Sequence, residues 1–281
     1  MVQKISLVLL GTCLSLYLAV GLLLRLGQAK LIFRPDAQLR ATPAKYNLDY
    51  QDVWLEVEQS RIHGWWIPHH QESAPIILYF HGNASNNGDV VDNAAIFNQL
   101  GLSVLLIDYR GYGRSSAVAP NETKAYQDAA AAWQYLTVTR NIDPQRIFVY
   151  GHSLGGAVAI DLAIHHPEMA GLIVEGTFTS MREIADYSLF FRLFPLDIII
   201  TQSFNSLDKI TSLNTPLLIF HGESDEIIPV FMSQKLFAAA PHPKQLIVIP
   251  QAQHNNLHHT QDPRYRNQLQ QFIHQNLAAS W

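Results

Sequence analysis

The pentapeptide Gly151-His152-Ser153-Leu154-Gly155 has the pattern G-x-S-x-G, which can present a serine as a nucleophile. The apolar run Arg146–Tyr150 precedes it, and the helix-prone segment Ala157–Ile164 follows it. A nucleophile elbow requires a strand, a sharp turn and a helix in this order, and glycine at positions 151 and 155 leaves room around the strained serine. The setting therefore favours an elbow over a glycine-rich turn without chemistry.

A serine hydroxyl needs a base to take its proton and a carboxylate to orient that base. Two loops downstream offer these groups. Asp225 lies beyond the apolar run Pro216–Phe220, and His254 lies beyond the run Gln245–Ile249. The order serine, acid, histidine is that of one class of hydrolases. We predict Ser153 as the nucleophile, His254 as the base and Asp225 as the residue that orients it.

Two alternatives concern the same residues. Glu175, at the end of the run Gly171–Val174, competes with Asp225 as the acid, and we favour Asp225. His254 and His258 are four residues apart and could mimic two metal ligands on one helix face. However, no glutamate accompanies them and the segment lacks a helical pattern. The sequence predicts neither a metal nor an organic cofactor.

A serine attack on a carbonyl creates an oxyanion, which preorganised backbone N–H groups stabilise. One such group should belong to Leu154, directly after the nucleophile. The second should follow the run Ile76–Phe80, where Gly82 permits a close approach and Asn83 offers its N–H. We predict that Asn83 and Leu154 form the oxyanion hole.

The elements that would position these residues follow an alternating order. Short apolar runs without internal alternation are separated by helix-like segments, which is typical of a parallel sheet buried on both faces. An alternating pair, Asp52–Val57 and Arg61–Ile67, predicts two antiparallel strands at one edge. The runs are Ile76–Phe80, Leu102–Ile107, Arg146–Tyr150, Gly171–Val174, Pro216–Phe220 and Gln245–Ile249, with helices at about Val90–Leu100, Glu122–Thr139 and Pro263–Leu277.

One connection is unusually long. It runs from Thr177 to Asn214, whereas such sheets usually join strand and helix through about 2–6 residues. Its stretch Tyr187–Ile200 is too apolar for a solvated loop. We predict an insertion at about 177–214 that forms a small helical cap over the carboxyl ends of the strands, where open parallel sheets place their sites.

The amino-terminal segment Ile5–Leu24 has 20 consecutive residues without a charge, enough for a helix of roughly 30 Å. We predict a membrane anchor over residues 1–30, spanning with residues 5–24, and a globular domain over 31–281. A cleaved signal peptide and a buried core helix are the alternatives. Arg25, Lys30, Arg34 and Arg40 follow the span, which favours a cytoplasmic domain by the positive-inside rule.

Composition excludes several classes of protein. The chain is 48% hydrophobic and 15% charged with a net charge of −4, so it is not typical of disordered proteins. Without a basic excess it has no source for binding nucleic acid through counterion release. Cys13 is the only cysteine, which excludes an intramolecular disulfide and a zinc site built from several thiolates.

Five motifs together resemble the alpha/beta hydrolase superfamily, and more narrowly its membrane-anchored bud-emergence-like branch, which includes protein depalmitoylases. They are His81-Gly82-Asn83, Asp108–Ser115, Gly151–Gly156, His221–Asp225 and Gln253-His254-Asn255. The resemblance covers about Leu31–Asn276, and Gln253 stands where the family often has glycine. It implies the alpha/beta hydrolase fold with a mostly parallel, eight-stranded sheet. It also implies a serine hydrolase acting on esters or thioesters, with Ser153, Asp225 and His254 as its triad.

The apolar cap beside a membrane anchor favours an acyl or lipid-derived substrate. Two other functions stay open: a serine peptidase of the aminopeptidase type acting on short apolar peptides, and a non-catalytic membrane scaffold. Asp108 and Arg114 are interpreted as residues that brace a loop rather than as substrate ligands.

Overall fold

A computed structural model describes residues 2–260 and 262–278. At its centre lies an eight-stranded sheet with the order β1-β2-β4-β3-β5-β6-β7-β8. The first two strands form an antiparallel hairpin, β2 pairs antiparallel with β4, and every later pair is parallel. The predicted alpha/beta architecture is thus confirmed. The strands are β1 (Gln51–Val57), β2 (Ser60–Ile67), β3 (Ile76–Phe80), β4 (Ser103–Ile107), β5 (Ile147–His152), β6 (Gly171–Glu175), β7 (Leu217–Gly222) and β8 (Lys244–Ile249).

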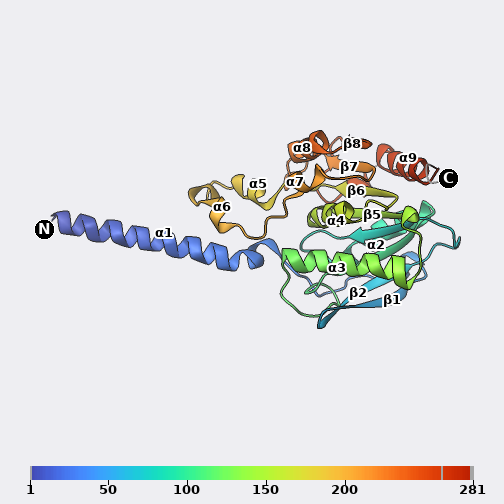
Figure 1. Ribbon diagram of the computed structural model, residues 1–281, viewed down its shortest axis with the longest axis horizontal. Helices are drawn as coiled ribbons and strands as arrows, with labels where there is room; N and C mark the ends of the chain where they lie inside the picture. Colours follow the sequence, from blue (N-terminus) through green and yellow to red (C-terminus); the bar gives the residue numbers. More distant parts are fainter. Residues whose placement is uncertain (1, 261, 279–281) are drawn as a thin grey trace.

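Helices cover both faces of this sheet (Figure 1). One face packs against α3 (Glu122–Gln134), α4 (Leu154–His165) and α8 (Val230–Ala239), and the other against α2 (Val91–Gln99) and α9 (Arg264–Ala278). Strand β3 shows why its sequence is apolar without alternation: Leu78 enters the first core and Ile77 the second. Each buried side chain of this size contributes roughly 1.5–3 kcal/mol.

Helix α8 lies outside the helices predicted from sequence. It begins directly after Pro229, and its first turn has no acidic residue and no side-chain cap. The usual start signals of a helix are therefore missing there. Met232 and Leu236 are nevertheless fully buried against the sheet, so tertiary packing defines this helix.

Between β6 and β7 the chain forms a cap of three short helices. These are α5 (Met181–Asp186), α6 (Leu196–Ile199) and α7 (Ser206–Ile210), with a 3-10 turn at Phe191–Leu193. Ser180 caps the start of α5, because its hydroxyl accepts a hydrogen bond from the N–H of Glu183.

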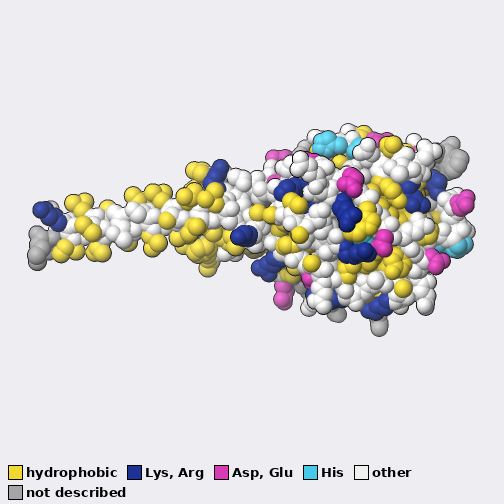
Figure 2. Space-filling model, turned by 90° about the horizontal axis from the view of Figure 1, so that it is seen from below, with side chains coloured by type: hydrophobic (Ala, Val, Ile, Leu, Met, Phe, Trp, Pro, Cys, Tyr) yellow, Lys and Arg dark blue, Asp and Glu magenta, His cyan; other side chains and the backbone are white. Residues whose placement is uncertain are grey.

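Helix α1 (Val2–Ile32) projects from the globular part of the molecule, with α6 beside its inner portion (Figure 1). Its best 18-residue window has a mean hydropathy of 2.4, and none of that window is buried. It is long and apolar enough to cross a membrane. Figure 2 shows hydrophobic side chains along the projecting helix, with Lys or Arg at its outer end and at its base.

Candidate active site

Ser153 occupies the sharp turn between β5 and α4. Its backbone has φ 54° and ψ −116°, a conformation that a non-glycine residue rarely adopts. The turn is held on both sides: the N–H of Ser153 donates to the carbonyl of Glu175 at 2.8 Å, and the Thr177 hydroxyl donates to the carbonyl of Ser153 at 2.9 Å. A Cβ at Gly155 would lie 2.1 Å from the carbonyl oxygen of Phe80, so only glycine fits there.

Three side chains from separate loops form a continuous line of hydrogen bonds. The Nε2 atom of His254 lies 3.0 Å from the Ser153 hydroxyl, and its Nδ1 atom lies 2.7 Å from a carboxylate oxygen of Asp225. An ionised carboxylate only accepts hydrogen bonds, so Nδ1 holds the proton and the lone pair of Nε2 faces the hydroxyl. The structure therefore brings the three predicted residues together in an arrangement that can activate a serine.

Asp225 is held in its charged form. Burial alone would raise the pKa of this carboxyl, but hydrogen bonds from His221 and His254 outweigh it and keep the pKa well below its usual range. The second carboxylate oxygen accepts from the backbone N–H groups of Ile227 at 2.9 Å and Ile228 at 2.8 Å. The contact with His221 was not predicted, although this histidine precedes Asp225 by four residues within one of the family motifs.

Glu175, the competing acid, makes other contacts. Its carboxylate accepts hydrogen bonds from the hydroxyls of Tyr150 and Tyr265, while His254 is bonded to Asp225. Burial raises the pKa of Tyr150 and Tyr265 well above the ordinary tyrosine value, and the nearby Glu175 raises both further. The phenols therefore stay protonated and able to donate to Glu175.

The loop after β3 approaches Ser153 closely. A Cβ on Gly82 would lie 3.2 Å from the Cβ of Ser153 and 2.9 Å from Nδ1 of His152. Within the described part of the chain, the backbone N–H groups of Asn83 and Leu154 donate to no acceptor. Both donors are thus available to a ligand beside the serine.

The side chain of Asn83 has a different role from its backbone. Its amide NH₂ donates to the carbonyl of Ile32, the last residue of α1, and its oxygen accepts from the N–H of Arg34 and from the hydroxyl of Tyr112, both at 2.8 Å. The predicted oxyanion loop is therefore tied to the end of the projecting helix. This role of the side chain was not predicted from the sequence, where only the backbone N–H of Asn83 was given a function.

The segment around His254 is braced by two further contacts. The Nε2–H of His152 donates to the carbonyl of His254 at 3.0 Å, and burial lowers the pKa of His152, which favours its neutral form. At Gln253, where the family often has glycine, the backbone N–H donates to the side chain of Asn256 at 2.8 Å. That bond closes the turn without glycine.

A cavity of about 1310 Å³ opens at Ser153 and His254. Its polar side includes Arg34, Asp92 and His258, and its apolar side is formed jointly by the cap and by the end of α1. The contribution of α1 was not predicted. The apolar lining includes Leu24, Leu31, Ile32, Phe178, Met181, Ile184, Phe191, Leu196, Ile199 and Ile200.

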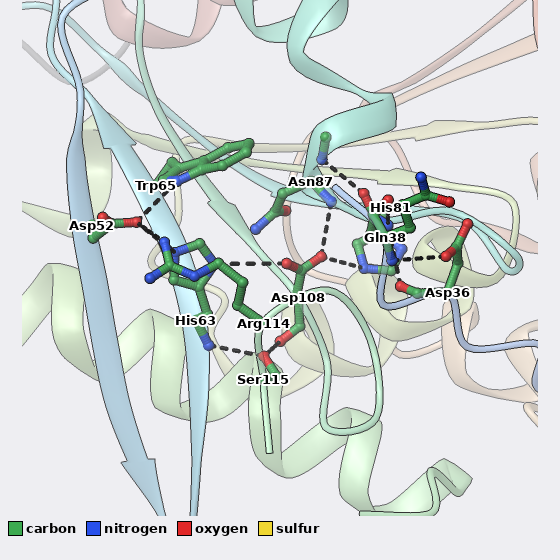
Figure 3. Close-up of polar contacts among 12 residues, drawn as sticks. Asp36, Gln38, Asp52, His63, Trp65, His81, Asn87, Asp108, Arg114 and Ser115 are labelled. Carbon is green, nitrogen blue, oxygen red and sulfur yellow. Dashed lines mark hydrogen bonds and ion pairs between the residues drawn. The ribbon is translucent and has the colours of Figure 1, made fainter. Parts of the chain in front are cut away.

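Asp108 and Arg114 contact neighbouring loops and strands, which agrees with their interpretation from the sequence as residues that brace a loop. Asp108 lies fully buried between His63 and His81 (Figure 3), with carboxylate-to-nitrogen distances of 3.7 and 3.5 Å. It also accepts a hydrogen bond from the N–H of Asn87 at 2.8 Å. Arg114 forms an ion pair with Asp52 at 2.8 Å on the hairpin.

One group of side chains at the cavity could hold a metal ion. Ligand atoms of Asp92, His258 and His259 lie within 4.8 Å of one another, and His259 is 2.9 Å from the carboxylate of Asp92. His254 is not part of this group, because its two ring nitrogens face Ser153 and Asp225. The Nε2 atom of His258 also lies 3.3 Å from the Asp92 carboxylate, whereas its buried Nδ1 atom has no hydrogen-bond partner among the described residues.

Comparison with known proteins places the chain in a family. Residues 71–195 match the family described as "Serine aminopeptidase, S33". Protein bem46 of Schizosaccharomyces pombe is 32% identical over 222 residues, which cover 76% of this chain and 74% of bem46. The lysophosphatidylserine lipase ABHD12 of Bos taurus is 31% identical in an alignment that covers 81% of this chain and 68% of that protein.

A solved structure agrees in fold. An esterase of Pyrococcus furiosus superimposes with a TM-score of 0.73 at 20% identity, covering 88% of this chain and 98% of the esterase. At that level of identity the likeness concerns the fold alone. Taken with the sequence relatives, it leads to one conclusion: the chain belongs to the alpha/beta hydrolase family, in the branch that includes bem46 and ABHD12.

Proposed function

We propose that this protein is a membrane-anchored serine hydrolase that cleaves carboxylic ester or thioester bonds of acyl substrates. The observation that carries the proposal is the line of hydrogen bonds from Asp225 through His254 to Ser153, at 2.7 and 3.0 Å, at the floor of a largely apolar cavity. A hydroxyl, an imidazole and an ionised carboxylate in this order constitute an activated nucleophile.

The reaction proceeds in two halves. The Ser153 oxygen attacks the carbonyl carbon while Nε2 of His254 takes its proton, and Asp225 stabilises the resulting imidazolium. The N–H groups of Asn83 and Leu154 hold the oxyanion. The tetrahedral intermediate then expels the alcohol or thiol, which receives the proton from His254. Water, deprotonated by His254, attacks the acyl-enzyme, and the carboxylic acid leaves as Ser153 regains its proton.

An acyl substrate is supported by the surroundings of the serine. The cavity wall opposite its polar side consists of aliphatic and aromatic side chains from the cap and α1. Apolar walls with a few convergent polar groups suit an amphiphile. The name of one relative, a lysophosphatidylserine lipase, agrees with a lipid-derived substrate.

A serine aminopeptidase is the second candidate, because the family that matches residues 71–195 carries that description. Such an enzyme needs a carboxylate free to bind the amino terminus of a peptide. Here the carboxylates lining the cavity are already engaged: Asp36 and Asp89 by Arg40, Asp92 by two histidines, and Glu175 by Tyr150. These contacts favour the ester or thioester hydrolase.

The deciding experiment is a series of p-nitrophenyl esters from acetyl to palmitoyl on the detergent-solubilised protein. Ser153→Ala is the test variant, and Ser212→Ala, at an exposed position that does not line the cavity, is its control. We expect hydrolysis that disappears in Ser153→Ala and persists in Ser212→Ala. Alanyl and leucyl p-nitroanilides test the peptidase. Equal inertness of wild type and Ser153→Ala towards every ester would refute the proposal.

We further propose that residues 5–24 span the membrane, that the hydrolase domain begins at about residue 31 with a cap at about 177–214, and that the domain faces the cytoplasm. The cluster of Arg25, Lys30, Arg34 and Arg40 supports this side. A membrane-impermeant amine reagent applied to intact cells should leave the lysines of the domain unlabelled. Labelling of these lysines in intact cells, before lysis, would show that the domain lies on the opposite side of the membrane.

A further inference from the structure

We propose that the end of α1, residues 24–32, and the cap together form a binding subsite for the acyl chain of a membrane lipid, which enters from the bilayer. This subsite rests on the hydrolase function proposed above. It adds that the anchor helix is one wall of the active site. The residues given this role on α1 are Leu24, Leu31 and Ile32.

The cavity follows the helix instead of touching it at one point. Leu24 and Ile32 both line it, and the helix rises about 12 Å between them. The opposing wall is the apolar inner side of the cap, with Ile184, Phe191 and Ile199. A volume of about 1310 Å³ exceeds the roughly 300–1,000 Å³ of pockets for drug-sized ligands, which leaves room for a long chain and a polar head.

This wall is fixed in place by a buried amide. Gln28 is only 7% exposed, and its oxygen accepts hydrogen bonds from the N–H groups of Thr201 at 2.8 Å and Gln202 at 3.0 Å. Its NH₂ group donates to the carbonyl of Ile199 at 3.1 Å. Because both ends of a buried amide are satisfied by the cap backbone, the helix keeps one register against the cap.

Exposed apolar residues of α1, of the cap and of the loop after β7 surround the mouth of the cavity. Leu31, Tyr187 and Ile227 all line the cavity, yet they are 53, 56 and 60% exposed. Large apolar side chains at an opening are poorly solvated by water and well solvated by lipid. The opening is therefore suited to receive a hydrocarbon chain.

The outer part of the cap reaches the depth of the membrane span. The ring of Tyr17 stacks on Phe194 with 5.0 Å between centroids, and its hydroxyl donates to the carbonyl of Leu193 at 2.8 Å. Tyr17 lies seven residues, or about 10 Å, inside the carboxyl end of the uncharged segment 5–24. Interfacial apolar elements enter a bilayer by a similar depth. The exposed apolar residues here are Leu189, Phe190, Leu193 and Ile198.

The test compares tryptophan substitutions on the two sides of the same helix, in the full-length protein reconstituted in phosphatidylcholine nanodiscs. Leu24→Trp and Leu31→Trp add bulk to the cavity wall. Leu23→Trp and Leu26→Trp are matched controls, because those side chains are 69 and 74% exposed and do not line the cavity. The readout is the ratio of kcat/KM for the palmitoyl ester to that for the acetyl ester.

We expect the wall variants to lower this ratio by roughly 15-fold, the effect of two methylene groups excluded from an apolar site at about fourfold each. The control variants should keep the ratio within about twofold of wild type. The proposed subsite would be refuted if the ratio is unchanged in both wall variants, or if it falls equally in the wall variants and the control variants. Neither result would affect the evidence for Ser153-dependent hydrolysis.

A binding measurement separates the subsite from the chemistry. In the Ser153→Ala background, fluorescent cis-parinaric acid should bind with a Kd raised about tenfold by Leu24→Trp and unchanged by Leu23→Trp. Binding that follows this pattern without any ester hydrolysis by the wild type would preserve the subsite and refute the proposed function. Binding unaffected by either wall variant would refute the subsite.

Discussion

The side-chain amide of Asn83 bonds to the carbonyl of Ile32, so the loop beside Ser153 and the last turn of α1 are directly joined. The two residues are 51 positions apart in the chain. Asn83 also accepts a hydrogen bond from the N–H of Arg34, so its side chain is bonded to the last residue of α1 and to the segment that follows it. A change in the position of α1 therefore affects the proposed oxyanion loop through one side chain.

Replacement of Asn83 by alanine tests this connection. The backbone N–H remains, but the bonds to Ile32, Arg34 and Tyr112 are lost, so we expect kcat to fall about tenfold through a mispositioned donor, equivalent to about 1.4 kcal/mol. Steady-state kinetics with the acetyl ester measure it. Asn98→Ala, at the far end of α2, is the matched control. A kcat equal to that of wild type would show that the loop is positioned without the tether.

Replacement of each of the two candidate acids by its amide distinguishes their roles. Asp225→Asn removes the acceptor that holds the Nδ1 proton of His254, and we expect kcat to fall roughly 10⁴-fold. Glu175→Gln loses only the charge on the acceptor of Tyr150 and Tyr265 and should cost less than about tenfold. Both kcat values come from the same ester assay. The reverse ranking would identify Glu175 as the acid that serves His254.

A methyl group at Gly82 should impair catalysis without unfolding the protein. The new Cβ would lie 3.2 Å from the Cβ of Ser153 and 2.9 Å from Nδ1 of His152, so the loop must move away from the serine. We expect Gly82→Ala to reduce kcat by about 10²–10³-fold, the cost of one displaced oxyanion donor. Gly27→Ala, where no atom lies within 4 Å of the added Cβ, is the control. Full activity of Gly82→Ala would exclude this loop from the oxyanion hole.

The stability of the protein should fall in mild acid. Burial lowers the pKa of His81, although Asp108 opposes the shift, so the folded state holds this residue neutral. Below about pH 6.5 His81 binds a proton in the unfolded chain but not in the folded chain. The free energy of unfolding therefore decreases by up to about 1.4 kcal/mol per pH unit. Above that pH the residue contributes no pH dependence.

Denaturant titrations from pH 7.5 to 5 measure this decrease. In His81→Asn, the new amide can still donate to the carbonyl of Gly82, as Nδ1 of the histidine does at 2.8 Å, but it cannot titrate. The slope below pH 6.5 should be smaller in this variant than in wild type. Parallel curves for the two proteins would show that His81 is not the titrating group.

Most of the fold could be predicted from sequence because both faces of the sheet are buried. In β3 every residue is apolar, so the run itself reveals a central parallel strand. Helix α8 could not be found in the same way, because Pro229 precedes it without a capping side chain and its burial depends on partners distant in sequence. Local patterns report local geometry, and α8 is determined by packing.

The same limit applies to the site. The pattern around Ser153 indicates an elbow because the strand, turn and helix are contiguous. The choice between Asp225 and Glu175 depends on which carboxylate faces His254, and no spacing encodes that direction. The apolar run of α1 predicts a span, but a run of leucines does not reveal that Leu24 and Leu31 line a cavity.

The contact of Tyr17 with the cap bears on substrate concentration, because Tyr17 belongs to the proposed membrane span and the cap forms one wall of the cavity. An enzyme that takes its substrate from the bilayer, as we propose, encounters molecules in two dimensions, so its occupancy follows the mole fraction of substrate in the surrounding leaflet and not the bulk molarity. Dilution of the leaflet with inert lipid would slow such an enzyme at constant total substrate. The KM of such an enzyme is therefore expressed as a surface density of substrate in the leaflet.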